Sequence, residues 1–316
     1  MIPTAIPRQL SFIIFHALSC RYLIPIVDCE LKLRSQDYDG EWRNWNSDST
    51  LDSAMDFPPY EYNPPADIAS VYYPYLGCYS SRNLSVLSEH MKIIRNTSIG
   101  VVAVSWCPLD EKGFPTDLFR SILDSALKND LRIAIHFQEC GHSKNMLQFA
   151  AQVQKIINNF GNHSALHRIL HKGANLPIFY IHDSDNDFPN QYRSILHQQG
   201  NMSIRGTMYD GVFLGLLTNY EQLRSFKLAQ FDGFYTYYGS NGLSYGSSWK
   251  NWQNLAKYAQ NNGLLFSPSV APGFPTQVLN SGTHIKRNTD EMGDTTKLPG
   301  GQQSQQASHD INYFIQ

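Results

Sequence analysis

FDGFYTYYGSNGLSYGSSW, residues 231–249, combines a strand, a loop and the start of a helix in one short segment. Its apolar and aromatic beginning is typical of a buried strand, with Tyr235 and Tyr237 near the carboxyl end. A loop rich in glycine, serine and asparagine follows, and Ser247 or Ser248 is then the expected helix N-cap. A strand followed at once by a helix is the unit from which parallel α/β sheets are built.

The same alternation of strand and helix runs through the chain from residue 99 onward. Units of about 30 residues that each hold a strand and a helix indicate parallel strands joined by right-handed crossovers. The predicted strands are 99–106, 131–137, 176–182, 210–217, 231–238 and 264–270. The predicted helices are 115–129, 143–160, 191–198, 220–228 and one that begins near Trp249.

These repeated units predict an α/β fold, a (β/α)8 barrel of the TIM type. No GxGxxG or other nucleotide-binding loop follows a predicted strand, which disfavours an open dinucleotide-binding sheet. About six of the eight strands that such a barrel needs are recognisable. We therefore expect the barrel to be incomplete in this chain.

Composition divides the chain into three parts. Residues 38–274 hold the predicted barrel, and 42% hydrophobic residues in 316 suffice for one large core. Residues 1–37 hold the apolar run LSFIIFHALSCRYLIPIV at 10–27, which suits a signal sequence or single-pass membrane anchor despite Arg21, or else a non-native exon. Residues 275–316 are rich in Gln, Ser, Thr, Asn and Gly, so we expect a disordered tail there.

Charge and cysteine content exclude some partners. A net charge of −2 and the lack of Lys/Arg runs predict no nucleic-acid binding. The five cysteines form no CxxC pair and no metal-ligand spacing, and their odd number leaves at least one free or bonded to another chain. Four N-glycosylation sequons permit a lumenal location without requiring it, at Asn83, Asn96, Asn162 and Asn201.

Aromatic side chains at the carboxyl ends of predicted strands suit a carbohydrate. Sugar C–H faces stack on rings while amide and hydroxyl groups bind sugar hydroxyls. Because strand carboxyl ends meet on one face of a barrel, we expect one groove lined by Trp106, His136, Tyr235, Tyr237 and Asn241. The alternative is a half-buried strand whose tyrosines are core residues.

Metal and nucleophile sites receive little support. His136 and His182 near adjacent strand ends, with Glu139 and Asp183 beside them, loosely resemble a barrel metallohydrolase. Such sites usually need an HxH pair on one strand, and the chain has none, so no metal or other cofactor is predicted. No GxSxG follows a strand either, which disfavours a serine nucleophile.

Five blocks of the sequence together resemble one protein family. In chain order they are YDGEWRNWN at 38–46, NPPADIASVYYPYLGCYSSRN at 63–83, IGVVAVSWCP at 99–108, the segment 231–249, and LLFSPSVAPG at 264–273. Over 38–274 the chain is similar to the endo-α-1,2-mannosidase family, glycoside hydrolase family 99. The resemblance implies a (β/α)8 barrel and a place at the Golgi membrane on its lumenal side. It also implies cleavage of a glucosyl-mannose unit from N-linked high-mannose glycans.

The resemblance also implies which residues act. The family carries its catalytic glutamates in an E-W-x-E-G pattern after the last strand, and no such pattern occurs before the chain ends at Gln316. We therefore expect no catalytic pair in this product. The family pattern HIEPY corresponds to HFQEC here, which makes Gln138 and Glu139 substrate-contacting candidates beside His136, although the glutamate is shifted by one residue. Cys107 replaces an aromatic residue that stacks on the sugar.

One further departure from the family leaves alternatives open. The family has an aromatic FYYPWYG motif before the YDG block, where this chain has IPIVDCELKLRSQ. The leading hypothesis is an endo-α-1,2-mannosidase that acts in N-glycan trimming. The alternatives are a non-catalytic glycan-binding product and a fragment without a stable fold. The oligomeric state is not addressed by the sequence.

Overall fold

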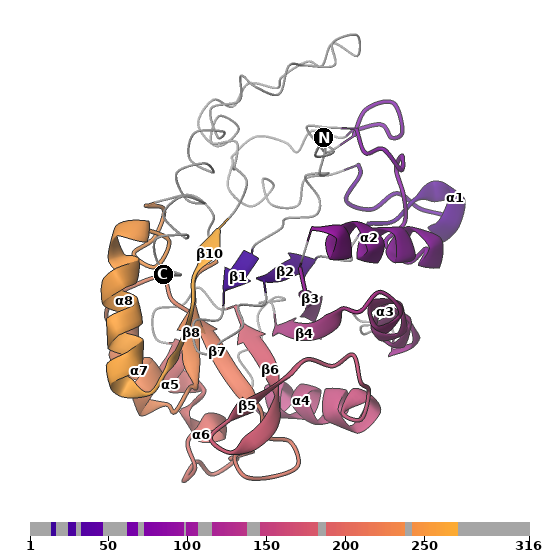
Figure 1. Cartoon of the computed structure of the whole chain (residues 1–316). Helices are drawn as coiled ribbons and strands as arrows, with labels where there is room; N and C mark the ends of the chain where they lie inside the picture. The colour runs from indigo at the N-terminus through magenta and orange to yellow at the C-terminus, as the bar shows by residue number, and fades with distance from the viewer. Residues whose placement is uncertain are drawn as a thin grey trace.

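The computed structural model describes residues 14–16, 25–29, 33–46, 62–68, 73–97, 99–106, 116–137, 146–182, 188–237 and 242–270, and every structural statement below refers to them. In these ranges seven strands run parallel, each beside the next in chain order (Figure 1). They are β2 (Pro25–Cys29), β3 (Val101–Trp106), β4 (Arg132–Phe137), β6 (Ala174–Ile181), β7 (Val212–Leu216), β8 (Gly233–Tyr235) and β9 (Leu265–Ser267).

The two ends of this row of strands meet across a short antiparallel strand. β1 (Ile14–His16) pairs antiparallel with β2 on one side and with β10 (Ser269–Val270) on the other. β10 follows β9 after Pro268 alone. A complete (β/α)8 barrel has eight parallel strands, and antiparallel β1 stands where the eighth is expected. The predicted incomplete barrel is thus confirmed, and β2 adds to the six strands read from the sequence.

Helices cover the outer side of the sheet (Figure 1). The predicted helices 115–129 and 143–160 appear as α3 (Thr116–Lys128) and α4 (Met146–Phe160), whereas 191–198 holds the last residue of α5 (Phe188–Gln191) and all of α6 (Arg193–Leu196). Ser248 is the N-cap residue of α8 (Trp249–Asn262), but its side chain makes no capping hydrogen bond. The helices are α1 (Gln36–Asp39), α2 (Leu84–Asn96), α3 (Thr116–Lys128), α4 (Met146–Phe160), α5 (Phe188–Gln191), α6 (Arg193–Leu196), α7 (Gln222–Leu228) and α8 (Trp249–Asn262).

Strand alternation separates two cores. Side chains of a strand point to opposite faces in turn, so Val102 and Val104 of β3 pack toward the helices while Val101 and Ala103 face the barrel interior. The helix-facing core is the larger of the two and includes Phe119, Phe160 and Phe226. The interior core lies among the strands and ends at Tyr180 and Tyr235.

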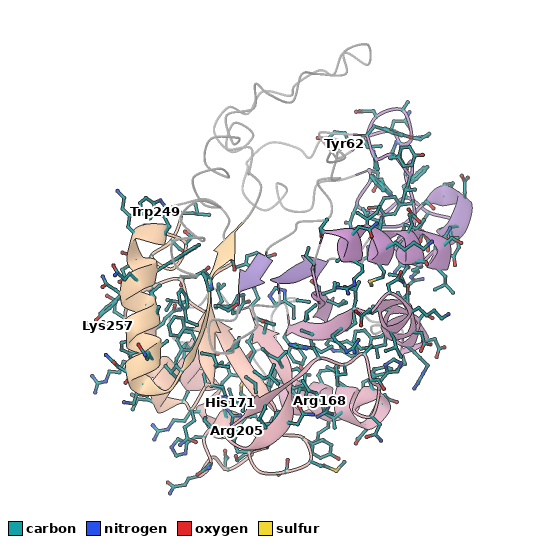
Figure 2. The ribbon with its side chains drawn as sticks, in the orientation of Figure 1. Tyr62, Arg168, His171, Arg205, Trp249 and Lys257 are labelled. Atoms are coloured by element: carbon teal, nitrogen blue, oxygen red, sulfur yellow. The ribbon has the colours of Figure 1, made fainter. Side chains whose placement is uncertain are left out.

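A hairpin closes the barrel interior at the amino-terminal ends of the strands. β5 (Arg168–His171) pairs antiparallel with the first half of β6. The turn between them, Lys172–Gly173, has positive φ at both residues (48° and 83°), which is the geometry of a tight two-residue hairpin. Ile169 and Leu176 pack against the interior core. Figure 2 shows His171 and Arg205 near each other at this end of the molecule.

Asp232 joins this hairpin to the segment that enters β8. Its carboxylate is 2% exposed and accepts hydrogen bonds from His171 Nε2 (3.0 Å) and Lys172 Nζ (2.9 Å). It also accepts from the Phe213 backbone N–H (3.0 Å) and pairs with the Arg205 guanidinium (2.9 Å). Burial raises the pKa of Asp232, but the His171 bond and the charges of Arg205 and Lys172 outweigh it and hold the pKa well below its usual range. Arg205 also donates to the carbonyls of Leu196, Gly211 and Gln230.

Some expectations from the sequence fall outside the described residues. The tail 275–316 lies wholly outside them. Of the apolar run 10–27, only Ile14–His16 and the first residues of Pro25–Cys29 are described, and both segments are strands. No helix in the described ranges has the length and apolar character needed to cross a bilayer.

Because two histidines are buried, we expect the folded protein to lose stability in mild acid. Burial disfavours the charged ring and lowers the pKa of His90 in α2 and of His167 before β5 to about 4. An unfolded chain takes up these protons near pH 6.5, so the folded state loses stability as the pH falls from there toward about 4. We expect a loss on the order of 2 kcal/mol per ring between pH 7 and pH 5.

Urea unfolding at the two pH values measures this loss. Replacing both histidines by leucine should remove most of the difference, because neither variant side chain binds a proton. An equal loss in the parent and in the double variant contradicts the assignment.

Candidate functional site

Five rings gather at the carboxyl ends of three strands. His136 comes from β4, Tyr180 and His182 from β6 and the residue after it, and Tyr235 and Tyr237 from the end of β8 and just beyond. We call these five residues the His/Tyr cluster. In barrels of this type the functional site lies at the carboxyl ends of the strands, so the cluster is the first candidate.

The register of the strands and the alternation of their side chains bring these residues together. His136 lies beside Ser105 of β3 and beside Tyr180 of β6 in the parallel pairing. Tyr235 pairs with Leu216, and both belong with Tyr180 to the interior core. Neighbouring residues in the register of a sheet point to the same face. Because Tyr180 and Tyr235 belong to the interior core and His136 is paired with Tyr180, all three side chains lie on the interior side.

The buried base of the cluster is hydrogen-bonded. His136 Nε2 lies 2.9 Å from the Tyr235 hydroxyl, and both side chains are fully buried. The tautomer of His136 decides which of the two donates. The ring of Tyr180 meets that of Tyr235 edge-on at 5.2 Å. Burial raises the pKa of Tyr180, so its hydroxyl stays protonated across the physiological range.

The upper part of the cluster is half-buried. His182 and Tyr237 meet edge-on with ring centroids 4.7 Å apart. The ring of His136 lies below both of them, 5.8 Å from His182 and 5.5 Å from Tyr237. Tyr237 and His182 thus lie over the hydrogen-bonded pair His136 and Tyr235. Together they present an apolar ring face and polar ring edges. This combination can bind a sugar ring through stacking and hydrogen bonds.

Trp106 does not join this cluster, and that part of the prediction is corrected. Its side chain is 1% exposed and faces the helices, where it packs edge-on against Phe119 (5.2 Å). Its indole N–H donates to Gln152 Oε1 (3.2 Å) in α4. Because strand side chains alternate, the interior position next to it is Ser105. Trp106 is therefore a core residue of the helix-facing layer.

The other predicted site residues divide into two groups. His136, Tyr235 and Tyr237 lie together in the cluster. Gln138, Glu139 and Asn241 lie outside the described residues, as do Asp183 and the neighbouring Asp185. From the sequence, His182 is a candidate only as a metal ligand, and Tyr180 is not among the predicted site residues. The signal for both was present in IFYIH, where the two residues stand two apart at a strand end.

Aromatic rings surround His136 and His182. Both imidazoles are neighbours of tyrosine rings. Within the described ranges, no three His, Cys, Asp or Glu side chains are placed to hold a metal ion.

Two loops after β7 and β8 frame the cluster. Tyr245 donates its backbone N–H to the Thr218 carbonyl (3.0 Å), which ties the loops together. A Cβ on Gly246 would lie 2.2 Å from the Leu217 carbonyl oxygen, so only glycine allows this approach. The Ser269 backbone N–H donates to Thr236 Oγ1 (2.7 Å), and its hydroxyl donates to the Thr236 carbonyl.

A small lobe follows strand β2 on the same side of the barrel. The described residues 33–46, 62–68 and 73–80 belong to the connection from β2 to α2, which leaves the carboxyl end of β2. The lobe has its own core, in which the Trp45 indole donates to the Tyr79 carbonyl (2.9 Å). Tyr79 in turn packs edge-on against His90 of α2 (5.0 Å). The lobe carries three exposed tyrosines, Tyr38, Tyr73 and Tyr75.

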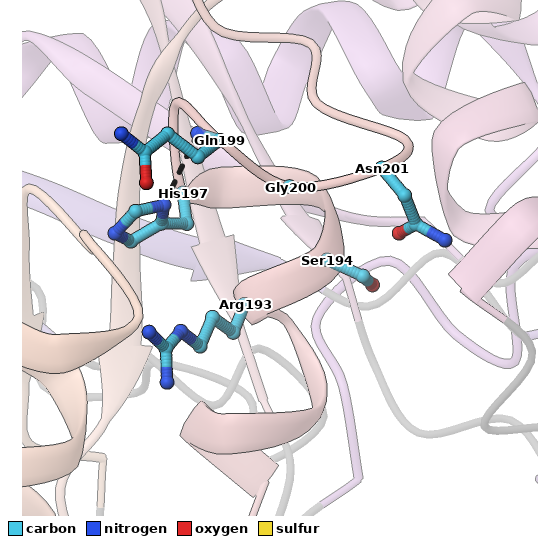
Figure 3. Close-up of a pocket in the computed structure, with 6 residues that line it drawn as sticks. All are labelled: Arg193, Ser194, His197, Gln199, Gly200 and Asn201. Atoms are coloured by element: carbon cyan, nitrogen blue, oxygen red, sulfur yellow. Dashed lines mark hydrogen bonds between the residues drawn. The ribbon is translucent and has the colours of Figure 1, made fainter.

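A shallow hollow of about 300 Å³ lies elsewhere (Figure 3). It is formed by α6 and the turn after it, where the His197 ring accepts from the Gln199 backbone N–H (3.1 Å). This connection leads from a helix to a strand, so it lies toward the amino-terminal ends of the strands, and none of its lining residues belongs to the His/Tyr cluster. The residues that line it are Arg193, Ser194, His197, Gln199, Gly200 and Asn201.

Comparisons with known proteins agree with the arrangement. Residues 34–292 match the profile of Glycosyl hydrolase family 99. The glycoprotein endo-alpha-1,2-mannosidase of Xenopus laevis is 40% identical over 248 residues, which cover 75% of this chain and 55% of that protein. The protein of the same name from Rattus norvegicus is 40% identical over 250 residues, covering 75% of this chain and 53% of that protein. The chain thus spans about half the length of these relatives.

A solved structure supports the fold as well. The GH99 endo-alpha-mannosidase from Bacteroides thetaiotaomicron superimposes with a TM-score of 0.71 at 27% identity, covering 80% of this chain and 73% of that chain. A second structure of that enzyme, in complex with bis-tris-propane, gives a TM-score of 0.66 at 28% identity, covering 80% of this chain and 71% of that one.

Proposed function

The chain belongs to glycosyl hydrolase family 99, and from this premise we propose that it serves N-glycan trimming by endo-α-1,2-mannosidase chemistry. In this proposal a glucosyl-mannose unit is removed from glucosylated high-mannose glycans, and the described barrel supplies the part that binds the mannose next to the cut. The observation that carries the proposal is the His/Tyr cluster at the carboxyl ends of the strands, in a chain with this family membership.

The cluster suits an α-linked mannose for a physical reason. One face of a mannose ring is largely C–H and stacks on an aromatic ring, while the hydroxyls at its edge need donors and acceptors. Tyr237 offers the ring face, and His182 offers a ring nitrogen beside it. The hydrogen bond between His136 and Tyr235 fixes the base beneath them, so little side-chain entropy is lost on binding.

Hydrolysis requires groups beyond this cluster. A glycosidase needs two carboxyl groups on either side of the scissile bond, and the family resemblance implies that they stand in an E-W-x-E-G pattern. The 316-residue sequence contains no such pattern. Three other carboxylates follow predicted strands, and all of them lie outside the described residues: Glu139, Asp183 and Asp185. We therefore assign substrate binding, and no catalytic residue, to the 316 residues in hand.

The 316-residue chain should hydrolyse glucosylated high-mannose glycan no faster than a heat-denatured control. Loss of an acid/base group typically costs on the order of 10²–10⁴ in rate, and here both are absent. Mass spectrometry of released saccharides measures the rate. Release of a glucosyl-mannose disaccharide above the control contradicts this assignment and places the catalytic carboxylates within these residues.

The cellular setting is part of the same proposal. N-linked high-mannose glycans of glycoproteins are the proposed partners, and the lumenal side of the Golgi membrane is the proposed location. The support is the family relationship, with which the four sequons are compatible. Imaging of the tagged chain in cells, with selective permeabilisation to tell the lumenal from the cytosolic side, tests the location. A cytosolic signal overturns it.

A further inference from the structure

The four sequon asparagines differ in their surroundings. Asn83 is the N-cap of α2, is half-buried, and accepts a hydrogen bond from the Ser85 backbone N–H (3.0 Å) through its side-chain oxygen. The side chains of Asn96, Asn162 and Asn201 are exposed. In the described part of the chain, none of these three side chains takes part in a hydrogen bond, so each has room to carry a bulky group.

The fold also separates them by face. A connection from a helix to the next strand lies at the amino-terminal ends of the barrel strands, opposite the face that carries the site. Asn96 ends α2 before β3, Asn162 follows α4 before β5, and Asn201 follows α6 before β7. All three therefore stand on the face opposite the His/Tyr cluster. Asn83 lies in the connection from β2 to α2, on the cluster side.

The backbone around two of the three exposed sites is anchored. Gly161, next to Asn162, gives its carbonyl to the Arg168 guanidinium (2.6 Å). Met202, next to Asn201, donates its backbone N–H to the Ser194 carbonyl (3.1 Å). Each asparagine thus sits on a fixed turn with its amide directed to solvent, and an attached glycan displaces no packed side chain.

We propose that Asn96, Asn162 and Asn201 are N-glycosylation sites and that Asn83 in the folded protein carries no glycan. This inference rests on the lumenal location in the proposed function. The donor is a lipid-linked oligosaccharide diphosphate. The side-chain amide nitrogen of asparagine bonds to C1 of the first sugar, the bond from C1 to the diphosphate oxygen breaks, and the proton from the nitrogen leaves with the lipid diphosphate.

A glycan at Asn83 conflicts with the fold for two reasons. The glycan bonds to the amide nitrogen beside the capping oxygen, so fitting it to this half-buried side chain moves Asn83 away from the start of α2 and removes the N-cap. The glycan would also stand on the face where the substrate must enter. The other three positions carry neither penalty, because their amides are exposed and lie on the opposite face.

Secretion of the full chain from human cells behind a cleavable signal peptide tests the proposal, because entry into the lumen then does not depend on residues 1–37. Enzymatic glycan release in ¹⁸O-water converts each occupied asparagine to labelled aspartate, which peptide mass spectrometry locates. We expect the label at Asn96, Asn162 and Asn201 and none at Asn83. Label at Asn83, or its absence at any of the other three, overturns the assignment.

Matched variants confirm each position. Asn162→Gln and Ser164→Ala both destroy the same sequon, so each should remove one glycan from the intact mass, whereas Asn83→Gln should remove none. Mannose binding measured before and after glycan release should be equal, and a change overturns the placement on the opposite face. Failure of the proposed function gives a different result, in which labelling follows the expectation while neither form binds mannose.

Discussion

Asp232→Asn should lower the free energy of unfolding by about 3–5 kcal/mol, the range for breaking a buried ion pair by removing one partner. The carboxylate is 2% exposed; Oδ1 accepts from His171 and Lys172, and Oδ2 accepts from the Phe213 backbone N–H and pairs with the Arg205 guanidinium. An asparagine keeps one acceptor oxygen but turns its amide N–H groups toward the other pair of donors. The variant therefore leaves the Arg205 charge or the His171 side of the network without its partner.

Asp130→Asn is the matched control. Asp130 also pairs with an arginine, Arg95 (2.7 Å), but both side chains are largely exposed. Its φ of 54° is one that asparagine adopts readily. Exposed pairs contribute about 0–1 kcal/mol, so this change should be nearly neutral. Urea unfolding of both variants at pH 7 makes the comparison, and a loss below about 1 kcal/mol for Asp232→Asn contradicts the account.

The pH dependence gives a second test of the same network. The pKa of Asp232 in the folded state lies below its usual range. For such a group the stabilisation is fully present above the unfolded carboxyl pKa of about 3.9, and it is lost as the pH falls through the folded value. The parent should therefore lose stability below about pH 4, and Asp232→Asn should show less of this acid loss.

Tyr237→Ala should weaken binding of an α-1,2-linked mannose disaccharide by about tenfold, equivalent to about 1.4 kcal/mol. The tyrosine ring is half-buried beside His182 and provides the ring face on which we place the sugar. Affinity of the parent should itself be weak, near millimolar, because one stacked ring and a few hydrogen bonds must offset the entropy cost of association.

Tyr245→Ala separates binding from packing. Tyr245 is also half-buried and packs on the helix-facing core, where it meets Tyr220 edge-on at 5.5 Å. Both truncations should lower the melting temperature to a similar extent, but only Tyr237→Ala should change the affinity for mannose. Equal affinities in the two variants support the alternative in which Tyr237 is a core residue.

The barrel was predictable because buried parallel strands leave a strong pattern. Runs such as VVAVSW and RIAIHF are apolar on both faces, and amphipathic helices follow each of them. Because both faces of such a strand are apolar, the sequence does not show which side chains point to the helices and which to the barrel interior. Trp106 was expected in the groove, but in a strand that is apolar throughout, sequence does not distinguish the helix-facing side from the interior.

The hairpin β5 and the role of Asp232 were beyond the reach of sequence patterns. Arg168–His171 is a short strand with few apolar residues, and its pairing depends on the Lys172–Gly173 turn. Asp232 lies in the segment FDG, next to aromatic residues that suggested a sugar site. Its partners lie 19 to 61 residues away in sequence, so only the fold shows that it holds the opposite end of the barrel together.

The central claim is that the His/Tyr cluster binds mannose, and one titration tests it most directly. Two-dimensional NMR of the 316-residue chain, with an α-1,2-linked mannose disaccharide added up to tens of millimolar, reports which residues sense the sugar. The account predicts saturable shifts centred on the ring signals of His182 and Tyr237, with none around Arg193 and His197. A folded chain whose cluster signals do not move, or whose shifts centre on another face, contradicts it.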